Sequence, residues 1–326
     1  MDSYASKLWS IVGSDKIFFD GSFLDKSGGI ARESNAVLNH LSKDTQVVTY
    51  KNQKLIFENQ ILVDRTIRQV NFKAAFTKRP IFYPSEVNAT ILQPQVMPIK
   101  LSGNGTRFIR LHDLFPITNP EWFPYRQSIF FKKSIPCKAE NIFFICVSYY
   151  TQEIFLRIFP EFKSRSEVLY CNTNNSFPEV SCGICEGCNF DTGLRYCLSV
   201  GTIEPRKNYQ YLLSEIPENW SYKLVIVGKY GWKSSSILRQ NVSGVSWLRS
   251  VCDGALKRLY ESAEAYISAS LDEGFNLPAF EARNFGIPLY LSDIPVHKEL
   301  HRGYAEFFET KRGRLRAILQ ELSIKG

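Results

Sequence analysis

Short apolar runs alternate with amphipathic stretches along most of the chain, and this alternation predicts strands joined by crossover helices. In the first half, buried-strand candidates lie at residues 16–20, 47–50, 108–111 and 142–148. Apolar residues at helical spacing follow at residues 30–42, 126–134 and 151–159. Strands separated by helices favour a parallel sheet that is covered on both faces. The first half is therefore predicted to be a doubly wound α/β domain.

The same alternation returns more regularly after residue 195. Further strands are predicted at residues 196–201, 223–228, 265–270 and 288–292, and helices from about 208, at 254–263 and at 278–285. The stretch from 171 to 194 is rich in Asn, Ser, Gly and Cys and lacks periodicity, which is typical of a linker. The predicted organisation is an N-terminal domain (1–170), a linker (171–194), a C-terminal domain (195–305) and a C-terminal helix (306–326).

Length and composition fit this organisation. The chain has 326 residues, which is enough for two α/β domains of ordinary size. Of these residues 44% are hydrophobic and 22% charged, which is typical of a folded protein and not of a disordered one. Its first residues, MDSYASKLWS, lack the basic region and apolar run of a secretory signal, and 18 apolar residues nowhere run together. We therefore expect a cytoplasmic protein.

The formal net charge of +8 is unevenly distributed. Thirteen lysines and arginines stand against five acidic residues between Lys51 and Ile135, and a second basic cluster lies between Lys311 and Arg316. One interpretation is a solvated basic face, and another is attraction to an anionic membrane surface or a phosphorylated lipid. No recognised nucleic-acid-binding motif accompanies the charge, so we expect no nucleic-acid partner.

Candidate chemistry lies in loops that follow predicted strands, where doubly wound sheets bind ligands. In the loop from 271 to 281, Pro278 suits the first turn of a helix, and the backbone N–H groups of residues 275–277 would form an anion site. Glu273 and Glu281 could accept hydrogen bonds from the hydroxyls of a sugar and a ribose. The alternative is a capping carboxylate followed by a solvated helix glutamate.

Two further loops have a related character. In the loop from 201 to 208, Arg206 and Lys207 could neutralise a diphosphate without a metal ion, or could be an ordinary exposed basic pair. In the N-terminal loop, the adjacent glycines Gly28 and Gly29 would let a ligand approach the backbone closely. That loop lacks the full G-x-G-x-x-G spacing, which weakens the case for dinucleotide binding.

Five segments in this order, GGIAR, RLHDLFP, SVGTIEPRKN, KLVIVGKYGW and SLDEGFNLPAFEARNFGIPLYLSDIP, together resemble glycosyltransferase family 4. The resemblance covers roughly residues 16–300 and is most specific at the pair Glu273 and Glu281. It implies the GT-B fold, in which two doubly wound Rossmann-like domains face each other across a cleft. Bacterial mannosyltransferases that build O-antigen or other polysaccharides are the most similar members.

The resemblance also implies roles for the donor-site residues. Glu273 would contact the transferred sugar, and Glu281 would hold the ribose hydroxyls of the nucleotide. Arg206 and Lys207 would stabilise the departing diphosphate, with help from the backbone amides near Asn276 and Leu277.

On the N-terminal side, the resemblance places Gly28 and Gly29 close to the phosphates. His112, with Asp113 beside it, would lie at the end of a strand near the reacting sugar.

The implied reaction is a hexosyl transfer with retention of anomeric configuration, without cofactor or divalent ion. GDP-mannose is the expected donor, and the expected acceptor is a glycan or a polyprenyl-diphosphate-linked oligosaccharide. Peripheral contact with the inner membrane face and sister glycosyltransferases are expected as further partners. Three rival interpretations are a catalytically silent protein that keeps the fold to bind a sugar nucleotide or an enzyme, an NAD-dependent oxidoreductase and a nucleic-acid-binding protein.

The sequence departs from the family pattern at three places. Asn276 replaces the commoner glycine, although asparagine tolerates left-handed backbone angles. Thr202 stands where many members have arginine. The segment available for a C-terminal helix is short, which bears on domain closure.

Eight cysteines are present, and Cys182, Cys185 and Cys188 form the unusual pattern C-x-x-C-x-x-C. Cys171 or Cys197 could add a fourth thiolate for zinc or an iron–sulfur cluster. The spacing lacks a second conventional pair, and the family resemblance implies no such site. We therefore expect reduced cysteines in a linker and no metal site.

Overall fold

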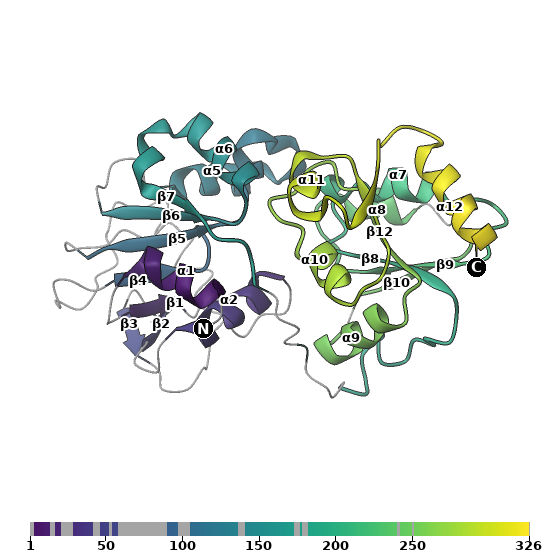
Figure 1. Cartoon of the computed structure of the whole chain (residues 1–326), viewed down its shortest axis with the longest axis horizontal. Helices are drawn as coiled ribbons and strands as arrows, with labels where there is room; N and C mark the ends of the chain where they lie inside the picture. Colours follow the sequence, from purple (N-terminus) through teal and green to yellow (C-terminus); the bar gives the residue numbers. More distant parts are fainter. Residues whose placement is uncertain are drawn as a thin grey trace. The chain divides into compact units, whose positions relative to one another are not determined.

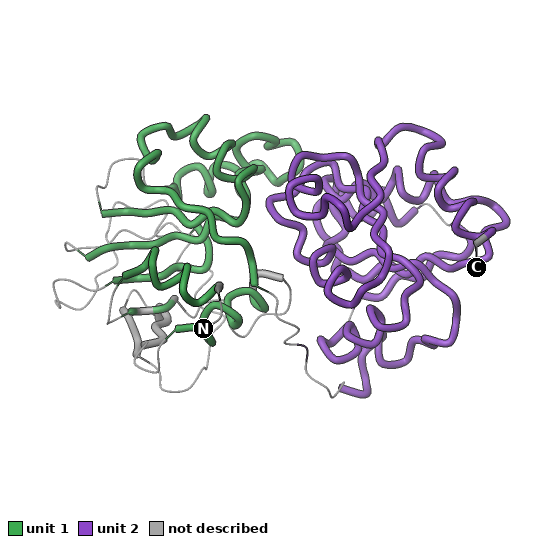
Figure 2. Tube along the Cα trace, in the orientation of Figure 1, with its two compact units in different colours: residues 1–174 green, residues 175–326 purple. Residues whose placement is uncertain are grey.

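The computed structural model describes residues 3–13, 17–20, 29–41, 46–51, 54–57, 90–96, 105–135, 141–172, 177, 182–239, 242–249 and 251–325. The chain divides into two compact units, residues 1–174 and 175–326 (Figure 2). The division falls inside the segment predicted as a linker.

Unit 1 contains a seven-stranded sheet with the order β3-β2-β1-β4-β5-β6-β7 (Figure 1). All neighbouring strands are parallel except β2 and β3, which pair antiparallel. The strands are β1 (Ile17–Asp20), β2 (Gln46–Lys51), β3 (Lys54–Phe57), β4 (Thr90–Gln93), β5 (Arg107–Leu111), β6 (Ile142–Cys146) and β7 (Ser166–Val168).

Apolar layers cover both faces of this sheet. Adjacent residues of β6 point to opposite faces, so Ile145 packs with Leu8 and Val37 of the N-terminal helices, whereas Phe144 packs with Phe155 and Phe162. The helices of unit 1 are α1 (Ser3–Val12), α2 (Gly29–His40), α4 (Phe115–Thr118), α5 (Tyr125–Ser134) and α6 (Tyr149–Ile158), with 3₁₀ helices η1 (Pro120–Trp122) and η2 (Pro160–Arg165).

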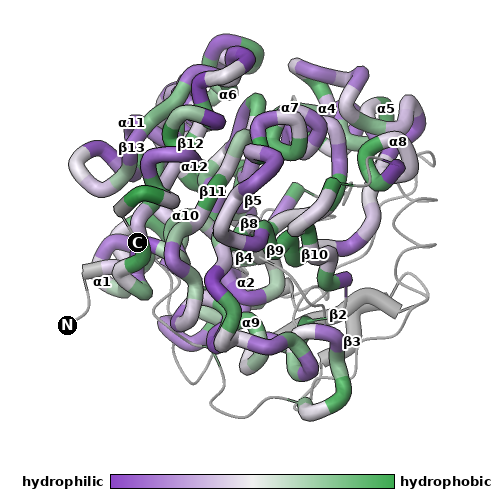
Figure 3. Tube along the Cα trace, turned by 90° about the vertical axis from the view of Figure 1, so that its right-hand side faces the viewer, coloured by the Kyte–Doolittle hydropathy of each residue, from purple (hydrophilic) through white to green (hydrophobic). Residues whose placement is uncertain are grey.

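Unit 2 contains a six-stranded parallel sheet with the order β10-β9-β8-β11-β12-β13. Its strands are β8 (Tyr196–Val200), β9 (Lys223–Val227), β10 (Val245–Leu248), β11 (Ala265–Ser268), β12 (Leu289–Ser292) and β13 (Ala305–Phe308). The central strands are mainly apolar runs, and green segments lie beside β9 in Figure 3. Such runs are typical of strands that are buried on both faces.

Helices follow the strands of unit 2 and bury both faces of its sheet. They are η3 (Pro205–Lys207), α7 (Tyr209–Ser214), α8 (Ser234–Leu238), α9 (Asp253–Glu261), α10 (Leu277–Asn284), α11 (Pro295–His301) and α12 (Arg314–Lys325). Both units are therefore doubly wound α/β structures, as the hydrophobic pattern predicted.

The C-terminal segment differs from the helix predicted at 306–326. Residues 305–308 form the edge strand β13, and α12 begins only at Arg314. Gly303 and Gly313, with φ of +82° and +83°, lie on either side of this strand and its following turn. Leu315 and Leu319 of α12 are fully buried in the core of unit 2, so the helix completes that unit.

Two of the basic residues counted between Lys51 and Ile135 are buried. Arg107 and Arg110 lie on β5 with exposed fractions of 2% and 3%. Arg107 donates to Gln93, and Arg110 pairs with Glu33 at 2.8 Å. The solvated-face interpretation is therefore wrong for these two arginines. Among the helices of the described ranges, none combines the length and apolarity needed to cross a bilayer.

Candidate functional site

The strand order of unit 2 determines where a ligand site is expected. The order changes direction between β8 and β11, and doubly wound sheets bind ligands outside the carboxyl ends of the strands at such a switch point. The loops that follow β8 and β11 therefore lie at one edge, and the backbone N–H of Leu271 donates to the carbonyl of Arg206 at 2.8 Å. These loops carry the predicted residues Arg206, Lys207 and Glu273.

Glu273 is the centre of a buried ionic cluster and has an exposed fraction of 4%. Its Oε1 accepts hydrogen bonds from Lys207 Nζ at 2.6 Å and from Ser270 Oγ at 2.7 Å, and its Oε2 accepts one from the Arg206 guanidinium. Burial alone would raise the pKa of Glu273, but the charges of Arg206 and Lys207 and the two Oε1 hydrogen bonds outweigh it and lower the pKa to about 2. Glu273 is therefore ionised at neutral pH.

The two cations are fixed rather than exposed. The side chains of Arg206 and Lys207 are 13% and 10% exposed, so the interpretation as an ordinary exposed basic pair is wrong. Arg206 also donates to Glu204 Oε1 at 2.9 Å and to the carbonyl of Asp272 at 3.1 Å. Glu204 and Glu273 thus balance the two positive charges in this state.

Glycines allow the loops after β8 and β9 to pack with their backbones in direct contact. A Cβ added at Gly228 would lie 1.9 Å from the carbonyl oxygen of Gly201, and one added at Gly201 would lie 2.8 Å from Lys207 Cε. A Cβ at Gly231 would lie 2.6 Å from Thr202 Cγ2. The close approach of the two loops therefore depends on the absence of a side chain at Gly228, and Gly201 leaves room for the Lys207 side chain.

The N-terminus of α10 begins at Asn276, which has a left-handed backbone with φ of 63°. This is the conformation that asparagine was predicted to tolerate in place of glycine. The Asn276 side-chain amide donates to His297 Nε2 at 2.8 Å and to Ser268 Oγ at 3.2 Å. The first backbone N–H groups of a helix favour an anion, and in α10 this position is held by Leu277, because Pro278 has no N–H and that of Ala279 donates to the carbonyl of Asn276 at 3.0 Å.

His297 holds that asparagine in place. Its Nδ1 lies 2.9 Å from the carbonyl oxygen of Ser292, so Nδ1 carries the proton and Nε2 accepts from Asn276. Burial lowers the pKa of His297 to about 4, so the ring is neutral at pH 7. The Oδ1 atom of Asn276 is buried and has no hydrogen-bond partner among the residues that the structure describes.

Glu281 lies about one turn inside α10 and is 1% exposed. Its Oε2 accepts a hydrogen bond from the hydroxyl of Tyr260 on α9 at 2.9 Å. Tyr260 in turn stacks on Phe285, with ring centroids 5.3 Å apart. The alternative of a solvated helix glutamate is therefore wrong.

In unit 1, His112 directly follows β5, as predicted. Its Nε2 lies 2.8 Å from the carbonyl oxygen of Pro94 and 3.9 Å from Glu33 Oε2. Burial lowers the pKa of His112 despite the opposing effect of Glu33, so the neutral ring donates from Nε2 to Pro94. Asp113 accepts a hydrogen bond from the backbone N–H of Phe115 at 3.3 Å, which is a local role.

The two predicted glycines of unit 1 differ in what the structure describes. Gly29 is the first residue of α2. Gly28 lies outside the described residues. The roles predicted for both glycines, and those predicted for the other site residues, stay predictions.

Sequence reasoning missed the side chains that hold the site together. Ser270, Tyr260 and His297 come from different elements and contact Glu273, Glu281 and Asn276 respectively. Only Ser270 had a usable signal, because it follows the apolar run of β11 at the carboxyl end of a central strand. The other two residues required knowledge of which helices pack together.

Comparison with known proteins identifies a related family. Residues 187–311, which make up most of unit 2, match the family model described as glycosyl transferases group 1. The serotype-specific mannosyltransferase WbdA of Escherichia coli is 26% identical over 341 residues, covering 90% of this chain and 40% of the relative. The O-antigen chain mannosyltransferase B of Escherichia coli is 24% identical over 298 residues, covering 86% of this chain and 73% of the relative. The chain thus spans about 40% of the length of the WbdA relatives that it matches.

The fold is also shared with solved structures. Sucrose-phosphate synthase from Thermosynechococcus elongatus superposes with a TM-score of 0.62 at 14% sequence identity, covering 96% of this chain and 89% of that chain. This likeness concerns the fold alone. It confirms the predicted GT-B class for the two doubly wound units, and the family match confirms the resemblance predicted from the motifs.

Proposed function

Because the second unit matches the group 1 glycosyl transferases and the chain has the GT-B fold, we propose that this protein is a retaining glycosyltransferase that moves mannose from GDP-mannose onto a glycan acceptor. The observation that carries the proposal is the buried cluster of Glu273, Arg206 and Lys207 at the switch point of unit 2. Two fixed cations beside a helix N-terminus suit a diphosphate, and a nearby ionised carboxylate suits sugar hydroxyls.

In the proposed reaction, the bond between the sugar C1 and the diphosphate oxygen breaks, and negative charge develops on the departing oxygen. Arg206 can bind two phosphate oxygens at once, and Lys207 supplies a second positive charge. Both are already held in position by Glu273 and Glu204, so little reorganisation is needed as the charge develops. The amides at the start of α10 add to this stabilisation.

The acceptor hydroxyl attacks C1 on the face from which the diphosphate leaves, and the leaving phosphate oxygen takes the hydroxyl proton. The new C1–O bond then has the configuration of the donor. We assign no protein side chain as the general base. Because the two cations can balance the leaving diphosphate, the transfer is expected to need no divalent ion.

Glu273 and Glu281 would accept hydrogen bonds from the donor. Glu273 is ionised and lies in the loop before α10, which suits a hydroxyl of the transferred sugar. Glu281 is held by Tyr260, which suits the two hydroxyls of a ribose. His112 uses Nε2 for Pro94, so Nδ1 of its neutral ring would be the acceptor for a sugar hydroxyl.

The identity of donor and acceptor rests on the relatives. The names of two of them specify mannosyltransferases, one of which acts on O-antigen chains. We therefore propose that the acceptor is a growing O-antigen-type glycan, carried on a polyprenyl diphosphate at the inner face of the membrane. There the protein would work in peripheral contact with the membrane and with sister glycosyltransferases.

A thermal-shift panel tests the donor site. GDP-, UDP-, dTDP- and ADP-sugars are added to the wild type, to Glu281→Ala and to Glu218→Ala, an exposed glutamate of the same unit that serves as the control. A ligand at about 100 times its Kd adds roughly 2.7 kcal/mol, which raises Tm by several degrees. We expect this shift with GDP-mannose in the wild type and the control but not in Glu281→Ala. Absence of a shift with every nucleotide sugar would overturn the proposal.

A transfer assay tests the chemistry. GDP-mannose and a lipid-linked acceptor glycan are incubated with the protein, and the anomeric configuration of the product is determined by NMR. We expect the configuration of the donor and unchanged transfer after brief treatment with EDTA. A product of inverted configuration would refute retention, and loss of transfer that added Mg²⁺ restores would refute metal independence.

A further inference from the structure

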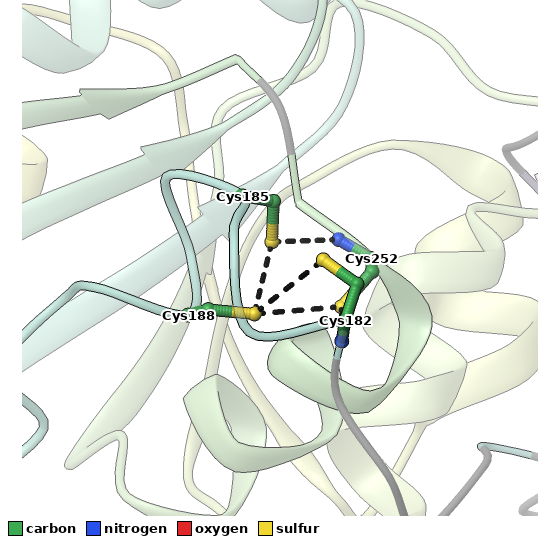
Figure 4. Close-up of side chains that lie close together, drawn as sticks. All are labelled: Cys182, Cys185, Cys188 and Cys252. Carbon is green, nitrogen blue, oxygen red and sulfur yellow. Dashed lines mark hydrogen bonds between the residues drawn. The ribbon is translucent and has the colours of Figure 1, made fainter.

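Four cysteine sulfurs converge at one point in unit 2. They belong to Cys182, Cys185, Cys188 and Cys252, and all four Sγ atoms lie within 4.8 Å of one another. Figure 4 shows the four side chains directed toward a common centre. The sequence suggested Cys171 or Cys197 as the fourth member, but the structure places Cys252 there. Cys171 instead contacts Arg110 at 3.6 Å, and Cys197 is buried in β8.

The separations match a tetrahedral site for one metal ion. A Zn–S bond of about 2.3 Å puts the sulfurs of a regular tetrahedron roughly 3.8 Å apart. Cys188 Sγ lies 3.7 Å from Cys182 Sγ, 3.8 Å from Cys252 Sγ and 3.2 Å from Cys185 Sγ. A cluster of several iron atoms spreads its cysteines over different irons, so it does not fit four sulfurs within 4.8 Å.

The backbone around the sulfurs is arranged to support them. The N–H of Cys252 donates to Cys185 Sγ, and the N–H of Cys182 donates to Cys252 Sγ, both at 3.3 Å. The N–H of Cys188 donates to the carbonyl of Cys185 at 3.0 Å, which closes a tight turn. Hydrogen bonds of this kind orient metal-bound sulfurs and stabilise their negative charge.

Close packing holds the turn against the start of α9. A Cβ added at Gly187 would lie 2.8 Å from Val251 Cγ1, so only glycine allows this approach. The Arg258 guanidinium donates to the carbonyls of Gly187 and Cys188, at 3.4 and 3.1 Å. Arg258 and the N-terminus of α9 therefore bring positive charge to a site where four thiolates around Zn²⁺ would have a net charge of −2.

We propose that Cys182, Cys185, Cys188 and Cys252 bind one structural Zn²⁺ ion. The four sulfurs complete a tetrahedral shell, so the ion has no open position for catalysis. The site joins residues 182–188, at the start of unit 2, to the N-cap of α9, because Cys252 lies 64 positions after Cys188. Because α9 also carries Tyr260, the ion would stabilise the helix that holds Glu281.

Metal analysis of the purified full chain tests the proposal. Protein from zinc-supplemented cells is measured by ICP-MS, and the zinc is then replaced by Co²⁺. We expect about one zinc per chain, and intense visible bands typical of tetrahedral cobalt with thiolate ligands. Cys252→Ser and Cys188→Ser should reduce zinc to well below half an equivalent and lower Tm by about 5 °C or more, because the bound ion stabilises only the folded state.

Cys197→Ala is the control, because it removes a thiol of the same unit that lies outside the four-cysteine site. It should keep one zinc per chain. Less than about a tenth of a zinc per wild-type chain, stoichiometric iron instead of zinc, or disulfides among these cysteines would overturn the proposal. The cobalt spectrum of the wild type decides the matter if the serine variants do not fold.

Discussion

The charge of Glu273 provides the sharpest test of the buried cluster. Glu273→Gln keeps the shape of the side chain and removes its charge, so Arg206 and Lys207 lose their common counterion. A pKa lowered from 4.5 to about 2 corresponds to about 3 kcal/mol of stabilisation at neutral pH. Removal of one partner from a buried ion pair typically costs about 3–5 kcal/mol, which is in the same range. We expect the variant to lose about 3 kcal/mol of unfolding free energy at pH 7.

The pH dependence follows from the direction of this shift. Because the pKa of Glu273 is lower in the folded than in the unfolded protein, its contribution is complete above about pH 4.5 and is lost as the pH falls toward 2. The difference between wild type and Glu273→Gln should therefore decrease by more than half at about pH 3. Urea unfolding followed by tryptophan fluorescence suits this comparison, because Trp220, Trp232 and Trp247 all lie in unit 2.

Glu264→Gln is the matched control. Glu264 pairs with Arg195 at 3.1 Å, but both side chains are about 40% exposed. Such a surface pair contributes less than about 1 kcal/mol. If Glu273→Gln cost no more than this control, or if its cost were the same at pH 7 and pH 3, the ionic cluster described here would be refuted. GDP binding should persist in the variant, because the two cations lose a carboxylate that competes with the diphosphate.

Two further predictions concern the surroundings of the site. Tyr260→Phe removes the hydroxyl that donates a hydrogen bond to Glu281. Loss of this hydrogen bond, worth about 1–2 kcal/mol, should weaken the affinity for GDP-mannose roughly tenfold. Titration calorimetry measures this affinity, and an unchanged Kd would contradict the role of Tyr260. Gly228→Ala places a Cβ 1.9 Å from the carbonyl oxygen of Gly201, so the loops must separate, and we expect a Tm several degrees lower with weakened donor binding. Gly193→Ala is the matched control, because Gly193 is exposed in the same unit and a Cβ there would meet only the Asp191 side chain, at 3.2 Å. A Gly228→Ala variant as stable as the wild type would contradict the close approach.

Local signals predicted most of unit 2. Its four central strands are mainly apolar, and Pro278 indicated where α10 begins. The edge strands β10 and β13 were harder to predict, because most of their side chains are only partly buried and a polar residue, Ser246 or Glu306, interrupts each apolar run. Strand β13 was therefore included in the predicted C-terminal helix.

The side chains that complete each site depended on topology. Cys252 lies 64 positions from Cys188, and no spacing rule connects the two residues. Tyr260 reaches Glu281 only because α9 packs beside α10. Sequence patterns identify what a single loop contains, whereas partners from separate elements emerge only when the sheet order is known.

The sheet order of unit 2 has a consequence for its synthesis on the ribosome. Strand β8 is made first but lies in the centre of the sheet, between β9 and β11. Until residues 265–268 have left the ribosome, the edge of β8 that later pairs with β11 has no partner. Most side chains of β8, including Tyr196 and Leu198, are apolar. An exposed apolar edge of this kind promotes aggregation. Translation that stalls between residues 201 and 264 should therefore leave an aggregation-prone nascent chain, and chaperones that bind extended apolar segments should protect it.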